Sequence, residues 1–115
     1  MRRFIAGALC LCLATPASAG AFYDGNWLYE QCTAKDGTRQ AFVCAAYLAG
    51  LAEGLDFGSV AKPQYNICLP PNTKLLQLHD VVVNALAAMP ERRTDPAFAL
   101  ASAALRKAWP CPWQH

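Results

Sequence analysis

The residues best able to carry out chemistry in this chain are its cysteines and histidines, and both are few. The chain has 115 residues, with six cysteines and two histidines. Two of the cysteines, Cys10 and Cys12, lie in an apolar N-terminal stretch. The other four are Cys32, Cys44, Cys68 and Cys111. An even number of cysteines in a small exported chain is typical of a disulfide framework, so we expect two disulfides, for which three pairings exist.

Other chemistries fit the sequence less well. A Cys–His nucleophile would leave an odd cysteine, and His115 is the last residue. His79 stands beside Asp80, but neighbours on a helix point about 100° apart. The four cysteines lack both the C-x-x-C spacing of redox centres and the close ligand pairs of zinc sites. Glu53 and Asp56 suit a solvated helix face better than an acid/base pair. We therefore expect a binding protein that is not an enzyme, with no catalytic residues, cofactor or metal.

The N-terminus has the pattern of a cleaved signal peptide over residues 1–19. Met1, Arg2 and Arg3 form a short positive region, residues 4–13 are apolar, and residues 17–19 read Ala-Ser-Ala, a typical cleavage site. We expect export to a bacterial periplasm, leaving one domain of residues 20–115.

Charge gives no indication of nucleic acid or an anionic membrane as a partner. The whole chain has 10 lysines and arginines against 8 acidic residues. Losing Arg2 and Arg3 removes two of the ten, so the remaining domain is about neutral. After residue 19 no apolar run is long enough to span a bilayer, and we expect no membrane association after cleavage.

The hydrophobic pattern predicts an all-α fold, a small four-helix domain stapled by two disulfides. The expected helices are residues 26–32, 39–56, one ending at 89, and one starting at 96. Thr38 is expected to cap the second helix, Asn72 or Thr73 the third, and Asp95 followed by Pro96 the fourth.

The helical period also predicts which residues face inward and how the cysteines pair. Ala46, Gly50 and Gly54 form a row of small residues on one helical face, where another helix can pack closely. Antiparallel packing of successive helices favours Cys32–Cys44 and Cys68–Cys111. The expected inner faces are Cys44, Leu48, Leu51 and Leu55; Leu75, Leu78, Val82, Leu86 and Met89; and Phe98, Ala101, Leu105 and Trp109.

Four motifs in order resemble those of the Rap/Tai family of type VI secretion immunity proteins. They are DGNWLYEQC, CAAYLAGLAEG, ICLPPNTKLLQL and AALRKAWPC, spanning about residues 22–111. One departure is Glu53, where the family often has aspartate. The resemblance implies a helical, disulfide-bonded periplasmic protein that blocks a peptidoglycan amidase by inserting a loop into its cleft. It also implies a tendency to form homodimers, and it carries no catalytic residues.

Two segments lie outside the expected helical faces and are candidates for contacting such a partner. They are the loop of residues 58–66 and the turn of residues 90–95. Tyrosine and arginine dominate protein-binding hot spots. The expected partner-binding residues are therefore Lys62, Tyr65, Arg92 and Arg93. Two alternative functions fit the same features: a small disulfide-bonded periplasmic stress chaperone, and an envelope structural protein.

Overall fold

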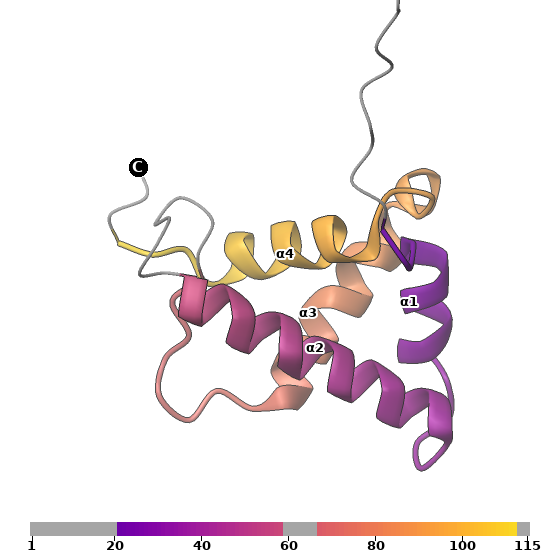
Figure 1. The fold of residues 1–115 in the computed structure, drawn as a ribbon, viewed down its shortest axis with the longest axis horizontal. Coiled ribbons are helices and arrows are strands. Elements are labelled where there is room, and N and C mark those ends of the chain that lie inside the picture. Colours follow the sequence, from indigo (N-terminus) through magenta and orange to yellow (C-terminus); the bar gives the residue numbers. More distant parts are fainter. Residues whose placement is uncertain (1–20, 59–66, 113–115) are drawn as a thin grey trace, which may run out of the picture.

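The computed structural model describes residues 21–58 and 67–112, and these form an all-α fold as predicted (Figure 1). The predicted signal peptide and the binding candidates Lys62 and Tyr65 lie outside the described residues. None of the described helices is long and apolar enough to cross a membrane. The helical elements are α1 (Gly25–Cys32), α2 (Arg39–Phe57), α3 (Leu75–Ala88), the short 3-10 helix η3 (Pro90–Arg92) and α4 (Ala97–Ala108).

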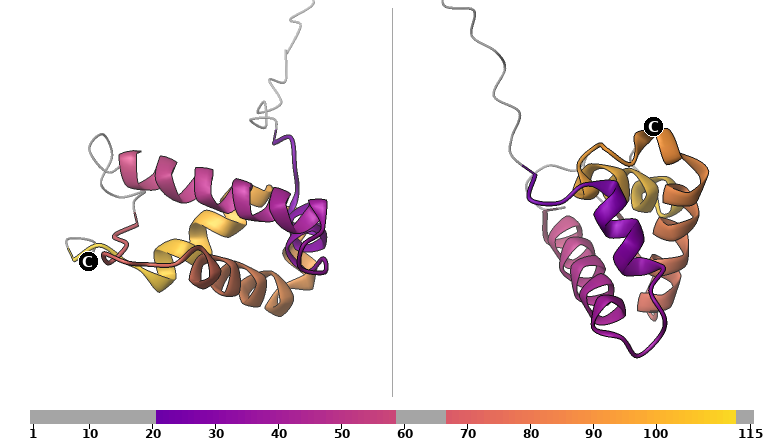
Figure 2. Two further views of the ribbon diagram at one scale, coloured as in Figure 1. Left: turned by 90° about the horizontal axis from the view of Figure 1, so that it is seen from below. Right: turned by 90° about the vertical axis from the view of Figure 1, so that its right-hand side faces the viewer.

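The helices enclose one apolar core. α1 stands beside the first half of α2, while α3 and α4 pack against each other on the other side (Figures 1 and 2). Each of the four α-helices contributes at least one fully buried side chain, and Ile67, before α3, adds another. Burying one such side chain stabilises the fold by roughly 1.5–3 kcal/mol. The fully buried leucines and valine of the helices are Leu28, Leu48, Val82, Leu86 and Leu105.

Both predicted disulfides are present. Cys32 and Cys44 are joined across the α1–α2 loop, with 5.0 Å between their Cα atoms. Cys68 and Cys111 are joined across the α3–α4 half, with 4.9 Å between their Cα atoms. The backbone N–H of Cys68 also donates to the carbonyl oxygen of Trp109 at 3.1 Å. The first disulfide therefore links α1 to α2, and the second links the segment before α3 to the segment after α4.

The start of α2 is as predicted, but the starts of α3 and α4 are not. Thr38 Oγ1 accepts a hydrogen bond from the N–H of Ala41 at 3.4 Å and caps α2. Asn72 adopts a left-handed φ of 71°, and Thr73 donates to the carbonyl of Pro70 at 2.7 Å. These two residues therefore form a turn. The cap of α3 is Lys74, whose N–H donates to the Gln77 side chain at 2.7 Å.

The predicted cap of α4 is wrong by one residue, because the Asp95 side chain has another partner. Its carboxylate accepts a hydrogen bond from Arg92 at 2.6 Å, and Pro96 takes the N-cap position. Two predicted inward residues are also largely exposed: Leu75 at 40% and Phe98 at 47%. Leu75 is the first residue of α3, beyond the reach of the core. On α4, Ala97 and Leu100 are buried instead, which turns Phe98 outward.

The row of Ala46, Gly50 and Gly54 on α2 does not pack against another helix, which corrects the prediction. Gly50 and Gly54 have nothing within 4 Å of an added Cβ, and Ala46 is exposed. The close approach occurs at Gly25, the first residue of α1. A Cβ there would lie 2.5 Å from Leu100 Cδ1 and 3.0 Å from the Cα and carbonyl oxygen of Arg93.

We expect Gly25→Ala to lower the free energy of unfolding by about 1–3 kcal/mol, because two of the crowded atoms belong to backbone that cannot rotate away. The matched control is Gly50→Ala, in an exposed helical position with open space. It should raise stability by about 0.5–1 kcal/mol, since alanine favours the helix. Urea denaturation of both variants checks this pair. Equal effects of the two substitutions would mean that α1 does not pack on the α3–α4 turn as the structure has it.

Candidate functional site

The predicted turn of residues 90–95 joins α3 to α4 and presents one arginine to solvent. Arg92 is exposed, and its Nε donates to Asp95 Oδ2 at 2.6 Å. The hydrogen bond to Asp95, followed by the charge of that carboxylate, raises the pKa of Arg92. The guanidinium therefore remains charged at every physiological pH and is held in one orientation by its neighbour.

Arg93, the second predicted anchor on this turn, is half-buried and already has partners within the fold. Its Nε donates to the carbonyl oxygen of Leu86 at 2.7 Å, and its guanidinium lies 3.9 Å from the centroid of the Tyr29 ring. A cation over an aromatic face is attracted by the quadrupole of the ring. Arg93 therefore links α1, α3 and the turn, and its contact with a partner stays a prediction.

Backbone hydrogen bonds fix the turn against the start of α1. The N–H of Gly25 donates to the carbonyl of Asp95 at 2.9 Å, and the N–H of Asn26 donates to that of Arg93 at 2.8 Å. These are orphan donors of the first turn of α1, which would otherwise need water or a cap. The turn is thus held rigidly at its base while Arg92 points outward.

A groove between α3 and α4 adjoins this turn. It has a volume of about 590 Å³. Alanines from both helices form its walls, together with Met89 and Leu100, and the charged lining residues are Arg92, Asp95 and Lys107. Small walls beside fixed charges can receive an apolar side chain flanked by polar groups. We call residues 90–95 with this groove the turn surface.

The two segments predicted to bind a partner follow different helices, α2 and α3. Residues 58–66 follow Phe57, the last residue of α2, and residues 59–66 lie outside the described residues. The C-terminal end of α2 and the turn of residues 90–95 lie at opposite ends of the bundle (Figure 1). The structure thus brings Arg92 and Arg93 together, whereas Lys62 and Tyr65 lie outside the described residues. A role in partner binding stays a prediction for all four.

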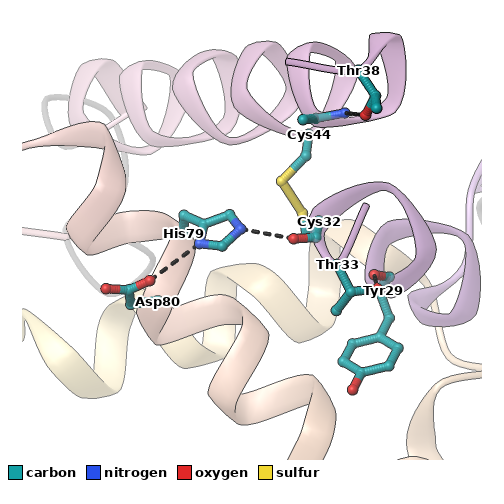
Figure 3. The surroundings of a disulfide bond; sticks show 8 residues. Tyr29, Cys32, Thr33, Thr38, Cys44, His79 and Asp80 are labelled. Atoms are coloured by element: carbon teal, nitrogen blue, oxygen red, sulfur yellow. Dashed lines mark hydrogen bonds and ion pairs between the residues drawn. A yellow bond between two sulfur atoms is a disulfide. The ribbon is translucent and has the colours of Figure 1, made fainter. Parts of the chain in front are cut away.

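His79 has a structural role beside the first disulfide (Figure 3). Its Nε2 lies 2.8 Å from the carbonyl oxygen of Cys32, so this nitrogen carries the proton and donates. Its Nδ1 lies 3.2 Å from Asp80 Oδ1, although the two residues are neighbours on a helix and were expected to diverge. Cys32 is bonded to Cys44 and offers no thiol. His79 therefore ties α3 to the end of α1.

Sequence reasoning missed an aromatic cluster that joins the N-terminal segment to α1 and α2. Tyr23 stacks on Trp27 with 3.8 Å between ring centroids, and Tyr47 meets Trp27 edge to face at 5.6 Å. Burial, and secondly the charge of Tyr23, raise the pKa of Tyr47. The sequence indicated this cluster only through the spacing of four residues between Tyr23 and Trp27, which places side chains on the same side of a helix.

Within residues 21–58 and 67–112, no three side chains of His, Cys, Asp or Glu converge as metal ligands would. The frame is a small disulfide-stapled helical module whose exposed features suit contact with another protein. Its sequence matches the Rap1a immunity proteins over residues 24–111, from the cap of α1 to the last bridged cysteine. The chain belongs to this family. No curated protein matches the sequence.

Membership of this family indicates an immunity role against an effector of type VI secretion, and hence a protein as the binding partner. Immunity proteins of this family are generally not enzymes. The predicted resemblance to the family is thereby confirmed, and the kind of effector is the next question.

Proposed function

We propose that this protein is exported to the periplasm, where it binds and inhibits a peptidoglycan amidase effector of type VI secretion. The match of residues 24–111 to the Rap1a immunity proteins is the observation that carries this proposal. An effector that cuts peptidoglycan acts where peptidoglycan lies, so its inhibitor has to be in the same compartment.

The two disulfides support the periplasmic location. Cys32–Cys44 and Cys68–Cys111 close both halves of the frame. Such bonds persist in oxidising compartments such as the bacterial periplasm, whereas cytosolic thiols are kept reduced. The signal-peptide pattern of residues 1–19 agrees with this assignment and supplies the route of export.

The turn surface is the part of the frame that we assign to the effector. Its turn is fixed to α1 by the bonds of Gly25 and Asn26, so little conformational entropy is lost when it enters a cleft. Arg92 stands exposed and charged at its tip. An arginine guanidinium can form two parallel hydrogen bonds to one carboxylate, which suits recognition of an acidic rim on the amidase.

The test is protection of bacterial cells that express a periplasm-directed amidase encoded beside this gene. The full-length protein should restore growth of these cells, because it reaches the compartment in which the amidase acts. A variant that lacks residues 1–19 should give no protection, although it has the same binding surface. Growth is followed by viable counts and cell lysis by turbidity.

Two outcomes of this assay would contradict the proposal. Equal protection by the variant without residues 1–19 would show that the protein acts before export. Failure to rescue any such amidase, together with capture of many unrelated proteins at low pH, would favour the stress chaperone instead. An envelope structural protein would give neither result, but its loss would alter cell shape in the absence of an amidase.

A further inference from the structure

A second hollowed region lies away from the turn surface, along the face that α2 shares with the start of α3. It consists of two adjoining hollows of about 370 and 240 Å³, and Leu75 lines both. The first is lined by Cys32, Cys44 and His79, and Figure 3 shows the disulfide and the imidazole of these residues. The second lies against Leu69 and Thr73 of the segment before α3. We call the two hollows together the α2/α3 groove.

The walls of this groove are apolar, and they differ in size on the two sides. On α2 the wall is a row of small side chains on one helical face. On α3 the wall is built from Leu75 and Leu76, which are 40% and 67% exposed. Small residues allow the backbone of a partner to come close, and large ones project into the gaps between its side chains. The α2 row is Ala41, Ala45, Ala49 and Ala52.

Another large apolar side chain stands on the same face of α2. Phe42 is 70% exposed, and it precedes Ala45 by three and Ala49 by seven residues, the spacing of one helical face. Phe42 and Leu76 are thus two of the most exposed large apolar residues of the described chain, one on each helix that borders the groove. Such a patch indicates an interaction site more often than a lone exposed side chain does.

The charges that line the groove all have the same sign. Asp36 lines the first hollow, and Glu53 and Asp56 line the second. Among the described residues, no lysine or arginine lines either hollow; Lys74, which precedes Leu75, is outside both linings. The carboxylates stand toward the two ends of the alanine row, which spans about 16 Å at 1.5 Å per helical residue.

We propose that the α2/α3 groove binds a helical segment of a partner protein, with apolar side chains at its centre and lysine or arginine toward both ends. The apolar centre covers the alanine row and Leu76, and the basic ends pair with Asp36 at one side and with Glu53 and Asp56 at the other. This surface is separate from the turn surface, so it can be occupied while an effector is bound.

The test uses a fluorescein-labelled synthetic peptide of about 15 residues, long enough as a helix to match the alanine row. It has a leucine- and alanine-rich centre with two arginines at each end, and a matched peptide carries glutamate in place of arginine. The protein is produced from its full-length gene, and fluorescence anisotropy measures its binding of each peptide. The arginine peptide should bind, and the glutamate peptide should bind at least about tenfold more weakly, because like charges oppose each other across the interface.

Variants of the protein assign the binding to the groove. Leu76→Ser and the double variant Glu53→Gln with Asp56→Asn should each lower the affinity for the arginine peptide by about five- to tenfold. Leu76 is mostly exposed, so its substitution should leave the thermal unfolding midpoint nearly unchanged. The matched control is Glu30→Gln, an exposed carboxylate on α1 that lines neither hollow; it should bind like the unaltered protein.

Equal binding of the two peptides, or unchanged affinity in the groove variants, would overturn the proposal. So would a concentration-dependent dimer that Leu76→Ser abolishes, since a second copy would then be the occupant. Amidase inhibition by the same variants separates this inference from the proposed function. The groove variants should inhibit the amidase as well as the unaltered protein does. If the unaltered protein itself fails to inhibit, the proposed function is wrong, but the peptide-binding results still stand.

Discussion

We expect the double variant Cys68→Ser with Cys111→Ser to lose about 4 kcal/mol of the free energy of unfolding. The bond closes a loop with a sequence separation of 43 residues, and in the chain-entropy account a longer loop restrains the unfolded chain more strongly. The bond also holds the segment before α3 next to the end of α4, where Ile67 is fully buried. A domain of this size has a small core, so such a loss is a large part of its total stability.

The matched comparison is the double variant Cys32→Ser with Cys44→Ser. Its loop has a sequence separation of 12 residues, for which the same account gives about 3 kcal/mol. The hydrogen bond from His79 to the carbonyl of Cys32 still ties α1 to α3 in this variant. Denaturation in guanidinium chloride, followed by circular dichroism, gives both values. An unchanged midpoint in the Cys68 and Cys111 variant would mean that the helical core alone maintains the fold.

Local patterns predicted the helices, and the order of the helices along the chain predicted the disulfide pairing. Thr38 stands next to the apolar period that it caps, and a short loop makes α1 and α2 antiparallel, which places Cys32 beside Cys44. The prediction failed where a tertiary contact competed with a local preference. Asp95 is a good capping residue by type, but Arg92 occupies its carboxylate.

Helical period alone also misplaced several side chains, because it gives the faces of a helix but not what covers them. The row that includes Gly50 and Gly54 was expected to receive a helix, whereas the close contact of the fold is at Gly25, where α1 meets the turn. Leu75 has a core residue type but lies in the first turn of α3, at the margin of the core, whereas Phe98 points outward because Ala97 and Leu100 take the buried face of α4.

The turn between the third and fourth helices was predicted from the sequence, but its contacts were not, and its role in binding stays a prediction. The turn of residues 90–95 was found because proline and charged residues interrupt the helical pattern there. The sequence could not show that Arg93 bonds to the Leu86 carbonyl and packs on Tyr29, since these contacts join three elements. It also could not show that this turn and the end of α2 lie at opposite ends of the bundle.

The second large effect expected is complete inhibition of the cognate amidase by one equivalent of this protein. A rigid turn surface loses little entropy on docking, and a nearly neutral domain gains little from long-range attraction. Inhibition should therefore persist as the salt concentration rises. Arg92→Glu should weaken the complex at least about tenfold, because it reverses the exposed charge at the tip of the turn.

Arg92 is a better probe of this surface than Arg93. Arg93→Ala removes a hydrogen bond and a cation–aromatic contact within the fold, so weaker binding by that variant would combine lost contact with lost stability. Lys107→Glu, in the same groove, is a second probe, and Glu30→Gln on α1 is the control that should inhibit normally. The thermal unfolding midpoint of each variant shows whether the frame is intact.

The most direct measurement is a titration of peptidoglycan hydrolysis by the amidase encoded beside this gene, with the purified protein as titrant. We predict that hydrolysis falls linearly with added protein and reaches zero at one inhibitor per amidase. With Arg92→Glu, hydrolysis should fall gradually and require a higher inhibitor concentration. Undiminished hydrolysis at a large excess of the folded protein would contradict the assignment of this chain as an amidase inhibitor.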